Sequence, residues 1–276
     1  MFGEIVDNIP ECNGELINVV SIKSIAEKSL PTYSGICSLE DGSKLLCDWQ
    51  NESLMHLDED YNIVQRIELP GQPFGMCAID STTVAISFPK LKEVHCVSAE
   101  NEVHLTSSFH TQSQCRGIAY ANGLIYVACG EWKTDKDTKS HIAVYSISGE
   151  LQSFRCDQHF SQLGHIAIYG SRLYVTDCHN GLLIMDENGD VSKIFTHKHM
   201  NNPLAVCAGH GNQLFLGGWS SHNIMLLNNE AQLSKVLLSQ QNGVKNIHSL
   251  FFDKMRLQLI YTMRDSRKIK IYALTY

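Results

Sequence analysis

The sequence predicts an all-β fold, a six-bladed β-propeller with four antiparallel strands in each blade. One strand pattern recurs six times, and its period of roughly 40–45 residues is that of a propeller blade. A strand left over at the amino end matches the strand missing at the carboxyl end. No linker or low-complexity segment interrupts the pattern, so residues 1–276 are expected to form a single domain.

The first two strands of every unit align on one apolar residue. Segments such as YSGICSLEDGSKLLCDW and CRGIAYANGLIYVACG have β-branched and aromatic runs bounded by turn residues. The six aligned residues lie 40, 42, 48, 40 and 44 residues apart and are Ile36, Met76, Ile118, Ile166, Val206 and Leu250. A charged insertion, EWKTDKDTKS, accounts for the longest interval. Third strands such as SLMHLD and fourth strands such as IVQRIEL follow through tight polar turns.

The sixth unit ends at Tyr276 after three strands, while LINVVSIKSIA at the amino end belongs to no unit. We therefore expect residues 16–26 to pair outside residues 268–275 as the outer strand of the last blade. Such pairing closes the ring and removes exposed sheet edges, which otherwise favour aggregation.

Composition excludes several classes of protein. The formal charge of −7 disfavours a broad nucleic-acid surface. The amino end has no basic segment followed by an apolar one, and no run approaches the length of a membrane span, so neither a signal peptide nor membrane association is expected. Ten cysteines without C-x-x-C spacing are expected to stay reduced, and Cys37, Cys77 and Cys207 recur at one strand position as small buried residues. The predicted location is cytoplasmic.

Two segments carry a family resemblance. VTDCHNGLLIMDENGDVSK and LLCDWQNESLMHLDEDYNIV resemble NHL repeats, in which a strand ends in Asp and a short loop with Asn leads into an apolar strand. PFGMCAIDSTTVAISFP followed by CRGIAYANGLIYVACG is similar to the C-terminal propellers of invertebrate tripartite-motif proteins. The resemblance implies a recognition module of a ubiquitin ligase. This chain has no cysteine/histidine zinc pattern of its own, so it would carry no ligase chemistry.

Chain direction predicts which loops share a face. The loop entering the first strand and the loop joining the second strand to the third lie at the same end of a blade. All three tryptophans, Trp49, Trp132 and Trp219, fall in the second kind of loop, 13, 14 and 13 residues beyond their aligned residues. Tryptophan and arginine are favoured binding anchors, although a tryptophan wedged between blades is the alternative. The predicted partner-binding residues are these three, Arg264 in the equivalent loop of the last blade and, nearer the channel, Tyr33, Phe74, Arg116, His165 and His248.

Catalytic and metal-binding alternatives have weaker support. His165 and His248 could converge, but zinc needs three or four ligands, so structural histidines are favoured. Asp48 and Asp177 end equivalent strands and could be paired acids; local capping of their own loops is the preferred interpretation. No nucleophile elbow, phosphate loop or dinucleotide motif is present. We expect no cofactor, no metal and no enzymatic activity.

The sequence thus predicts a non-catalytic interaction propeller that binds a protein partner on the face bearing the tryptophan loops. Single-stranded RNA binding through Arg116, basic loops and aromatic stacking is one alternative, which the net charge disfavours. Recognition of a small ligand or carbohydrate on the tryptophans is another. The oligomeric state is not predicted.

Overall fold

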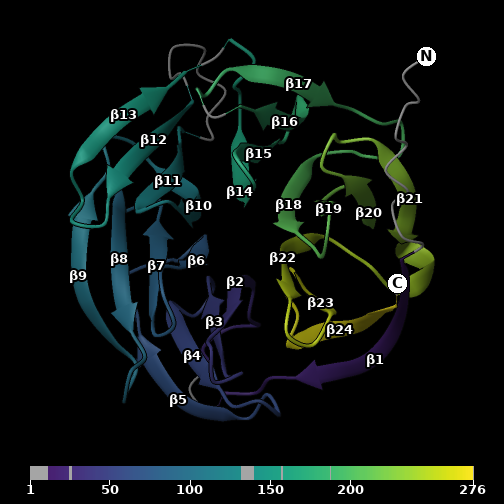
Figure 1. Cartoon of the computed structure of the whole chain (residues 1–276). Coiled ribbons are helices and arrows are strands. Elements are labelled where there is room, and N and C mark those ends of the chain that lie inside the picture. The colour runs from purple at the N-terminus through teal and green to yellow at the C-terminus, as the bar shows by residue number, and fades with distance from the viewer. Residues whose placement is uncertain (1–11, 25–26, 132–139, 157, 187, 276) are drawn as a thin grey trace, which may run out of the picture.

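The computed structural model describes residues 12–24, 27–131, 140–156, 158–186 and 188–275. Six four-stranded antiparallel sheets stand around a central axis, as Figure 1 shows, which confirms the predicted six-bladed propeller. The expectation that residues 1–276 form one domain stays a prediction, because residues 1–11 lie outside the described residues.

Each blade runs outward from the axis in chain order. Blades one to three contain β2 (Tyr33–Ser38), β3 (Lys44–Asp48), β4 (Ser53–Leu57) and β5 (Ile63–Glu68); β6 (Met76–Ala78), β7 (Thr83–Phe88), β8 (Glu93–Ser98) and β9 (His104–His110); β10 (Cys115–Ala121), β11 (Leu124–Cys129), β12 (His141–Ser146) and β13 (Leu151–Arg155). Blades four to six contain β14 (Leu163–Tyr169), β15 (Arg172–Asp177), β16 (Gly181–Met185) and β17 (Val191–Phe195); β18 (Pro203–Ala208), β19 (Gln213–Gly218), β20 (Asn223–Asn228) and β21 (Leu233–Leu238); β22 (Ile247–Asp253), β23 (Gln258–Met263), β24 (Lys268–Thr275) and β1 (Asn13–Ser21).

The two chain ends close the ring in the last blade. β1 pairs antiparallel with β24 from Asn13 opposite Thr275 to Ser21 opposite Lys268, and Figure 1 shows it along the outer edge of that blade. The pairing is confirmed, but the predicted strand, residues 16–26, is set too far along the chain. β24 begins at Lys268 opposite Ser21, and the pairing ends with one bond from the Ile22 N–H to the Arg267 carbonyl at 2.8 Å; Ile22 itself is 2% exposed.

The apolar core is divided among the contacts between neighbouring blades. Among the described residues, six buried clusters each join two adjacent blades, including the pair of the sixth blade with the first. In one of them, Phe215 of blade five stacks on Phe252 of blade six with ring centroids 5.9 Å apart. Stability is therefore shared around the ring, and every blade depends on both neighbours.

Buried hydroxyl groups also link alternate pairs of blades near the axis. Thr176 Oγ1 on β15 donates to the carbonyl of Leu204 in blade five at 2.8 Å, and Thr262 Oγ1 on β23 donates to the carbonyl of Tyr33 in blade one at 2.7 Å. Ser87 on β7 bonds the carbonyl of Arg116 in the same way. These bonds satisfy inner-strand carbonyls that face the next blade rather than a strand partner.

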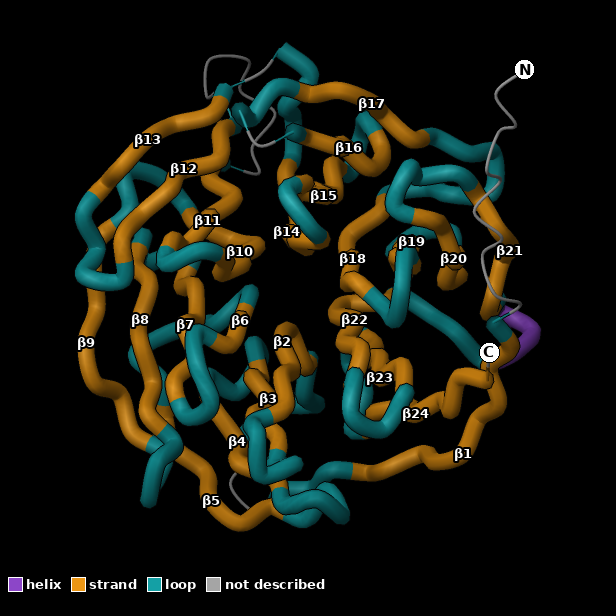
Figure 2. Tube along the Cα trace, in the orientation of Figure 1, coloured by secondary structure: helices purple, strands orange, loops and turns teal. Residues whose placement is uncertain are grey.

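Strands dominate the trace, as Figure 2 shows, and the helix in the described part of the chain is the short 3₁₀ turn η1 (Gln240–Asn242). No helix there has the length and apolarity needed to cross a membrane.

Candidate functional site

Backbone hydrogen bonds hold the two predicted kinds of loop together at one end of the blades. In five blades, the residue after the second strand donates its N–H to the carbonyl of the residue four places before the aligned apolar residue, at 2.9–3.1 Å. Trp49 bonds Thr32 in this way, Trp219 bonds Asn202 and Arg264 bonds Asn246. The entry loops and the second-to-third-strand loops of these blades therefore share a face, as chain direction predicted.

A pocket of about 280 Å³ opens among these loops. We call it the aromatic–cationic pocket, after the rings and positive charges in its wall. It is lined by Thr32, Trp49, Gln72, Phe74, Pro89, Lys90, Gln114, Arg116, His248 and Arg264. Blades one, two, three and six supply these residues, so the ring, rather than any one blade, forms the pocket. Five of the predicted site residues are among them.

Three rings in contact form the floor of the pocket. The Phe74 ring stacks on the His165 ring with centroids 5.0 Å apart, and the His248 ring is tilted against Phe74 at 5.7 Å. Phe74 and His248 are 6% and 7% exposed. His165 also lines a separate cavity of about 320 Å³ in the central channel, so the three rings stand between the aromatic–cationic pocket and the channel.

Trp219 is not part of the pocket wall but contacts the His248 ring. Its ring meets His248 edge-on at 5.8 Å, and the Arg264 guanidinium lies over the Trp219 ring, 5.7 Å from its centroid. Arg264 is exposed and also pairs with Asp265 at 3.3 Å. Both contacts of Arg264 are of the kind that is individually weak at an exposed site, so this side chain can rearrange around a ligand.

Arg116 occupies the inner wall and is 5% exposed. Its guanidinium donates to the Gly130 carbonyl and to Gln114 Oε1, the latter at 3.0 Å. Burial lowers the pKa of Arg116 to about 10, which leaves the group positively charged at neutral pH. The pocket therefore contains a positive charge whose position is fixed by hydrogen bonds to Gly130 and Gln114.

Both histidines are held neutral. Burial lowers the pKa of His165 to about 4, and burial together with the nearby His165 and Arg264 lowers that of His248 to about 3. Nδ1 of His248 and Nε2 of His165 have no hydrogen-bond partner among the described residues. An unpaired buried imidazole nitrogen is costly, and a ligand atom would satisfy it.

Tyr33, one of the nine predicted residues, lies elsewhere. Tyr33 is fully buried, and its hydroxyl donates to the Ile22 carbonyl at 3.2 Å, so its placement beside the channel opening is wrong. Successive side chains of a strand point to opposite sides, and the next residue, Ser34, has the position equivalent to Phe74 and Arg116. Trp132 lies outside the described residues; Gly130 makes the backbone bond in blade three that Trp49 makes in blade one.

Asp48 and Asp177 act locally. Asp48 Oδ1 accepts the N–H groups of Thr32, Gln50 and Asn51 at 3.1–3.3 Å. Asp177 Oδ1 accepts those of His179 and Asn180, each at 3.0 Å. The interpretation as loop caps is therefore confirmed, and the two carboxylates do not converge.

The sequence analysis missed several lining residues, although a signal for them exists. Thr32, Gln72 and Gln114 each lie four places before an aligned residue. That position is polar in every unit: Thr32, Gln72, Gln114, Gln162, Asn202 and Asn246. A polar residue repeated at blade spacing directly before an apolar strand marks the entry loops, and hence this face of the ring.

The channel cavity contains the recurring cysteines. Cys37, Cys77 and Cys207 all line it, and burial raises the pKa of each thiol, for Cys37 to about 12. Cys37 is 3% exposed, as predicted, whereas Cys77 and Cys207 are only partly buried because their inner strands face the channel. Their thiols are uncharged at neutral pH, which indicates packing rather than reactivity.

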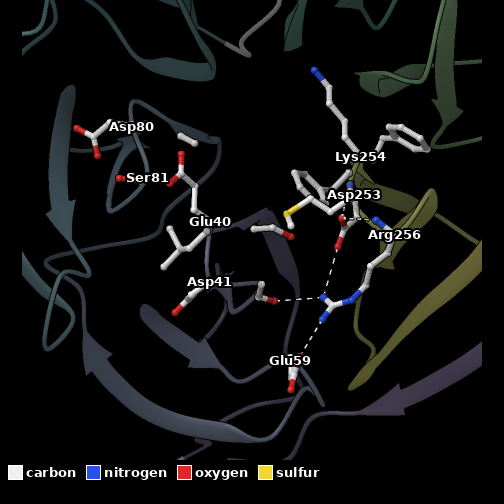
Figure 3. A pocket seen from close by; sticks show the side chains of 15 residues that line it. Glu40, Asp41, Glu59, Asp80, Ser81, Asp253, Lys254 and Arg256 are labelled. Carbon is white, nitrogen blue, oxygen red and sulfur yellow. Dashed lines mark hydrogen bonds and ion pairs between the residues drawn. The ribbon is translucent and has the colours of Figure 1, made fainter.

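A different cavity, of about 560 Å³, lies between the loops that join the first strand to the second in blades six, one and two (Figure 3). Its wall carries five carboxylates against two cations: Glu40, Asp41, Glu59, Asp80, Asp253, Lys254 and Arg256. Arg256 bridges the sixth and first blades through Glu59 at 3.2 Å and Asp253 at 3.7 Å, as the dashed lines show. These loops are at the opposite ends of the strands from the aromatic–cationic pocket, so the two faces differ in charge.

No group of three or more His, Cys, Asp or Glu side chains in the described part of the chain is arranged to hold a metal ion.

Comparison with known proteins places the chain by fold. No family model matches it, and no curated protein does. A virginiamycin B lyase from Staphylococcus aureus is similar over 94% of this chain and 99% of its own, with a TM-score of 0.69 and 12% identity. A streptogramin B lyase is similar over 94% and 98%, with a TM-score of 0.66 and 15% identity. A chain of the nidogen/laminin complex is similar over 80% and 84%, with a TM-score of 0.64 and 13% identity.

These similarities correct one expectation from the sequence. The absence of enzymatic activity was expected because familiar catalytic motifs are missing, but a lyase has this same architecture. The expectation is therefore wrong: the fold accommodates enzymes as well as members of protein complexes. At identities of 12–15%, the likeness establishes the six-bladed propeller and nothing finer.

Proposed function

We propose that this propeller binds a segment of a partner protein on the face that carries the aromatic–cationic pocket. The observation that carries the proposal is the convergence of Trp49, Phe74, Arg116, His248 and Arg264, from four different blades, on one pocket. Aromatic and arginine side chains at the centre of a concave site are the groups that most often dominate binding energy between proteins.

Rigidity supports the proposal. Phe74 and His248 are buried with their rings in contact, so their positions are fixed before binding and little side-chain entropy remains to be lost. Trp49 is half-buried at the rim, where it can cover an incoming apolar side chain. The nidogen/laminin similarity supports the proposal at the level of fold, because that chain is part of a protein complex.

A finer form of the proposal follows from the resemblance to tripartite-motif propellers. The partner would then be a substrate or regulator of a ubiquitin ligase, and the chain would act in the cytoplasm. This finer form rests on sequence resemblance alone, through the NHL-like segments around Asp48 and Asp177 and the segments PFGMCAIDSTTVAISFP and CRGIAYANGLIYVACG. Its test is whether the propeller, fused to a RING domain, directs ubiquitin to the protein that it binds.

The binding face can be tested without knowing the partner. A displayed library of random peptides is selected on the immobilised propeller, and the enriched peptides are measured against a Trp49→Ala/Trp219→Ala variant. We expect enriched peptides with a common large apolar residue and at least a tenfold loss of affinity for the variant. The matched control is Phe154→Ala, which removes an exposed aromatic ring from the outer strand β13, where 44% of the residue is exposed.

Equal binding by wild type and the tryptophan variant, with both melting at the same temperature, would refute the proposed face. The RNA alternative predicts a different result. A labelled single-stranded oligonucleotide would bind with an affinity that falls steeply with added salt, because phosphate contacts release counterions. Salt-insensitive peptide binding without oligonucleotide binding supports the protein partner.

A further inference from the structure

The charged side chains that line the aromatic–cationic pocket are of one sign. Among the described residues, its lining includes Lys90, Arg116 and Arg264 and contains no aspartate or glutamate. The whole chain carries a formal charge of −7, and the cavity on the other face has more carboxylates than cations. A pocket whose charge opposes that of the protein around it favours an anionic ligand on this face.

An unsatisfied polar atom points to the same chemistry. His248 lines the pocket, is 7% exposed and has an Nδ1 atom without a partner among the described residues. That nitrogen is itself buried, so the imidazole must rotate before Nδ1 can donate to an acceptor oxygen in the pocket. Charge stabilisation of an anion in the pocket comes from Arg264.

The volume limits the size of the ligand. About 280 Å³ is the space of about nine liquid waters and lies just below the usual range for small-molecule sites. The apolar walls are the rings of Trp49 and Phe74 together with Pro89. One large side chain with an adjacent charged group fits this description, whereas an extended cofactor does not.

The Asp265 carboxylate competes with an anionic ligand for Arg264. Its carboxylate pairs with Arg264 Nε at 3.3 Å and accepts a hydrogen bond from Thr32 Oγ1 at 3.3 Å. Thr32 belongs to the pocket wall, so Asp265 lies at the rim. Its side chain is 57% exposed, and an ion pair so exposed to water is easily exchanged for another.

We propose that the aromatic–cationic pocket binds a carboxylate carried next to one aromatic or large apolar side chain, as at a chain terminus or an acidic residue of the partner segment. The inference rests on the proposed function for its biological source. In this proposal, Arg264 pairs with the ligand carboxylate, Trp49 and Phe74 form the apolar walls, and His248, once its ring has rotated, donates a hydrogen bond.

Small probes test the chemistry directly. N-acetylphenylalanine supplies the ring and the carboxylate, its amide keeps the ring without the charge, and phenyl phosphate replaces the carboxylate by phosphate. Binding is followed through the indole N–H signals of ¹⁵N-tryptophan-labelled protein, with the Trp49 signal assigned by a Trp49→Phe variant. We expect N-acetylphenylalanine to shift the Trp49 signal and to bind at least tenfold more tightly than its amide.

Charge variants separate the pocket from general electrostatics. Arg264→Gln is expected to weaken binding of N-acetylphenylalanine about tenfold, and Lys254→Gln, which removes one positive charge from the opposite face, to leave it unchanged. Asp265→Asn is expected to strengthen binding severalfold, because the competing carboxylate is gone. Asp265 has a φ of 50°, a conformation that asparagine accepts, and a gain of affinity is not a result that misfolding produces.

Three results would overturn the inference: equal binding of the acid and its amide, tighter binding of phenyl phosphate than of the carboxylate, or no response of the Trp49 signal to any probe. Failure of this inference is distinguishable from failure of the proposed function. Selected peptides that depend on Trp49 but lack any acidic preference would refute the carboxylate and keep the docking face. Binding of N-acetylphenylalanine without any selected peptide that depends on Trp49 would keep the carboxylate site and refute the docking face.

Discussion

The hydroxyl of Thr262 is expected to be a main polar link that closes the ring. It is fully buried on β23 of the last blade, donates to the Tyr33 carbonyl of the first blade at 2.7 Å and accepts the N–H of Ser249 at 3.1 Å. Replacing Thr262 by valine keeps the shape but leaves one buried acceptor and one buried donor without a partner.

The magnitude follows from these two bonds. A buried polar group left unsatisfied costs about 1–3 kcal/mol, so two groups cost about 4 kcal/mol. The added methyl group returns about 1 kcal/mol through apolar burial, which leaves a destabilisation of about 3 kcal/mol. For a chain of this size, that free energy corresponds to a fall in melting temperature of about 6–12 °C.

Thermal unfolding followed by circular dichroism measures the effect. Thr262→Ser is the control, since it keeps the hydroxyl and removes only a methyl group, at a cost of about 1 kcal/mol. The reasoning would be refuted by a valine variant that melts within about 2 °C of wild type, or by a serine variant that loses as much stability as valine.

Three further outcomes are expected. Lys44→Met breaks the ion pair between the Lys44 ammonium and the Asp253 carboxylate, which are 3.7 Å apart on side chains 0% and 4% exposed, and should cost about 3 kcal/mol in urea unfolding. Most of that loss should be recovered in Lys44→Met/Asp253→Asn. No recovery would mean that the buried carboxylate is not the cause. The pKa values of His165 and His248, about 4 and 3, lie below the ordinary value near 6.5. As pH falls below 6.5, the unfolded chain therefore binds protons that the folded chain does not bind, so stability should fall from pH 7 to pH 5. His165→Gln/His248→Gln should flatten this dependence, and an unchanged slope would contradict it. A chain starting at Ile22 lacks β1 and exposes the edge of β24, so light scattering should show association that the full chain does not show. A monomeric, equally stable product would contradict the conclusion that β1 closes the ring.

The repeat determined most of the architecture from the sequence alone. Strand alternation and blade spacing are local properties of the chain, and each apolar anchor from Ile36 to Leu250 recurs at the interval that one four-stranded blade requires. The same argument predicted that the first strand completes the last blade. Its bounds were misplaced because apolar alternation continues past Ser21, whereas the partner strand begins at Lys268 and the backbone pairing ends with one bond from the Ile22 N–H to the Arg267 carbonyl.

The site was also partly predictable from chain direction and strand spacing. Chain direction alone assigns Trp49, Phe74, Arg116, His248 and Arg264 to one end of the blades, and the structure brings these five into one pocket. Side-chain direction within that end was not predictable at every blade. Tyr33 lies three places before its aligned residue Ile36, whereas Phe74 lies two places before Met76, so the two side chains point to opposite sides: Tyr33 packs between blades and Phe74 lines the pocket.

The sequence by itself determined the number of blades, the closure and the face on which the aromatic and cationic residues gather, since these follow from periodicity and chain direction. The tertiary structure alone decided which of those residues meet across blades and that, within the described part of the chain, the pocket lining holds three cations and no carboxylate and Nδ1 of His248 lacks a partner. The physical reason is distance along the chain. Trp49 and Arg264 are 215 residues apart in sequence, and the curvature of six packed sheets, which no local pattern encodes, brings them to the same pocket.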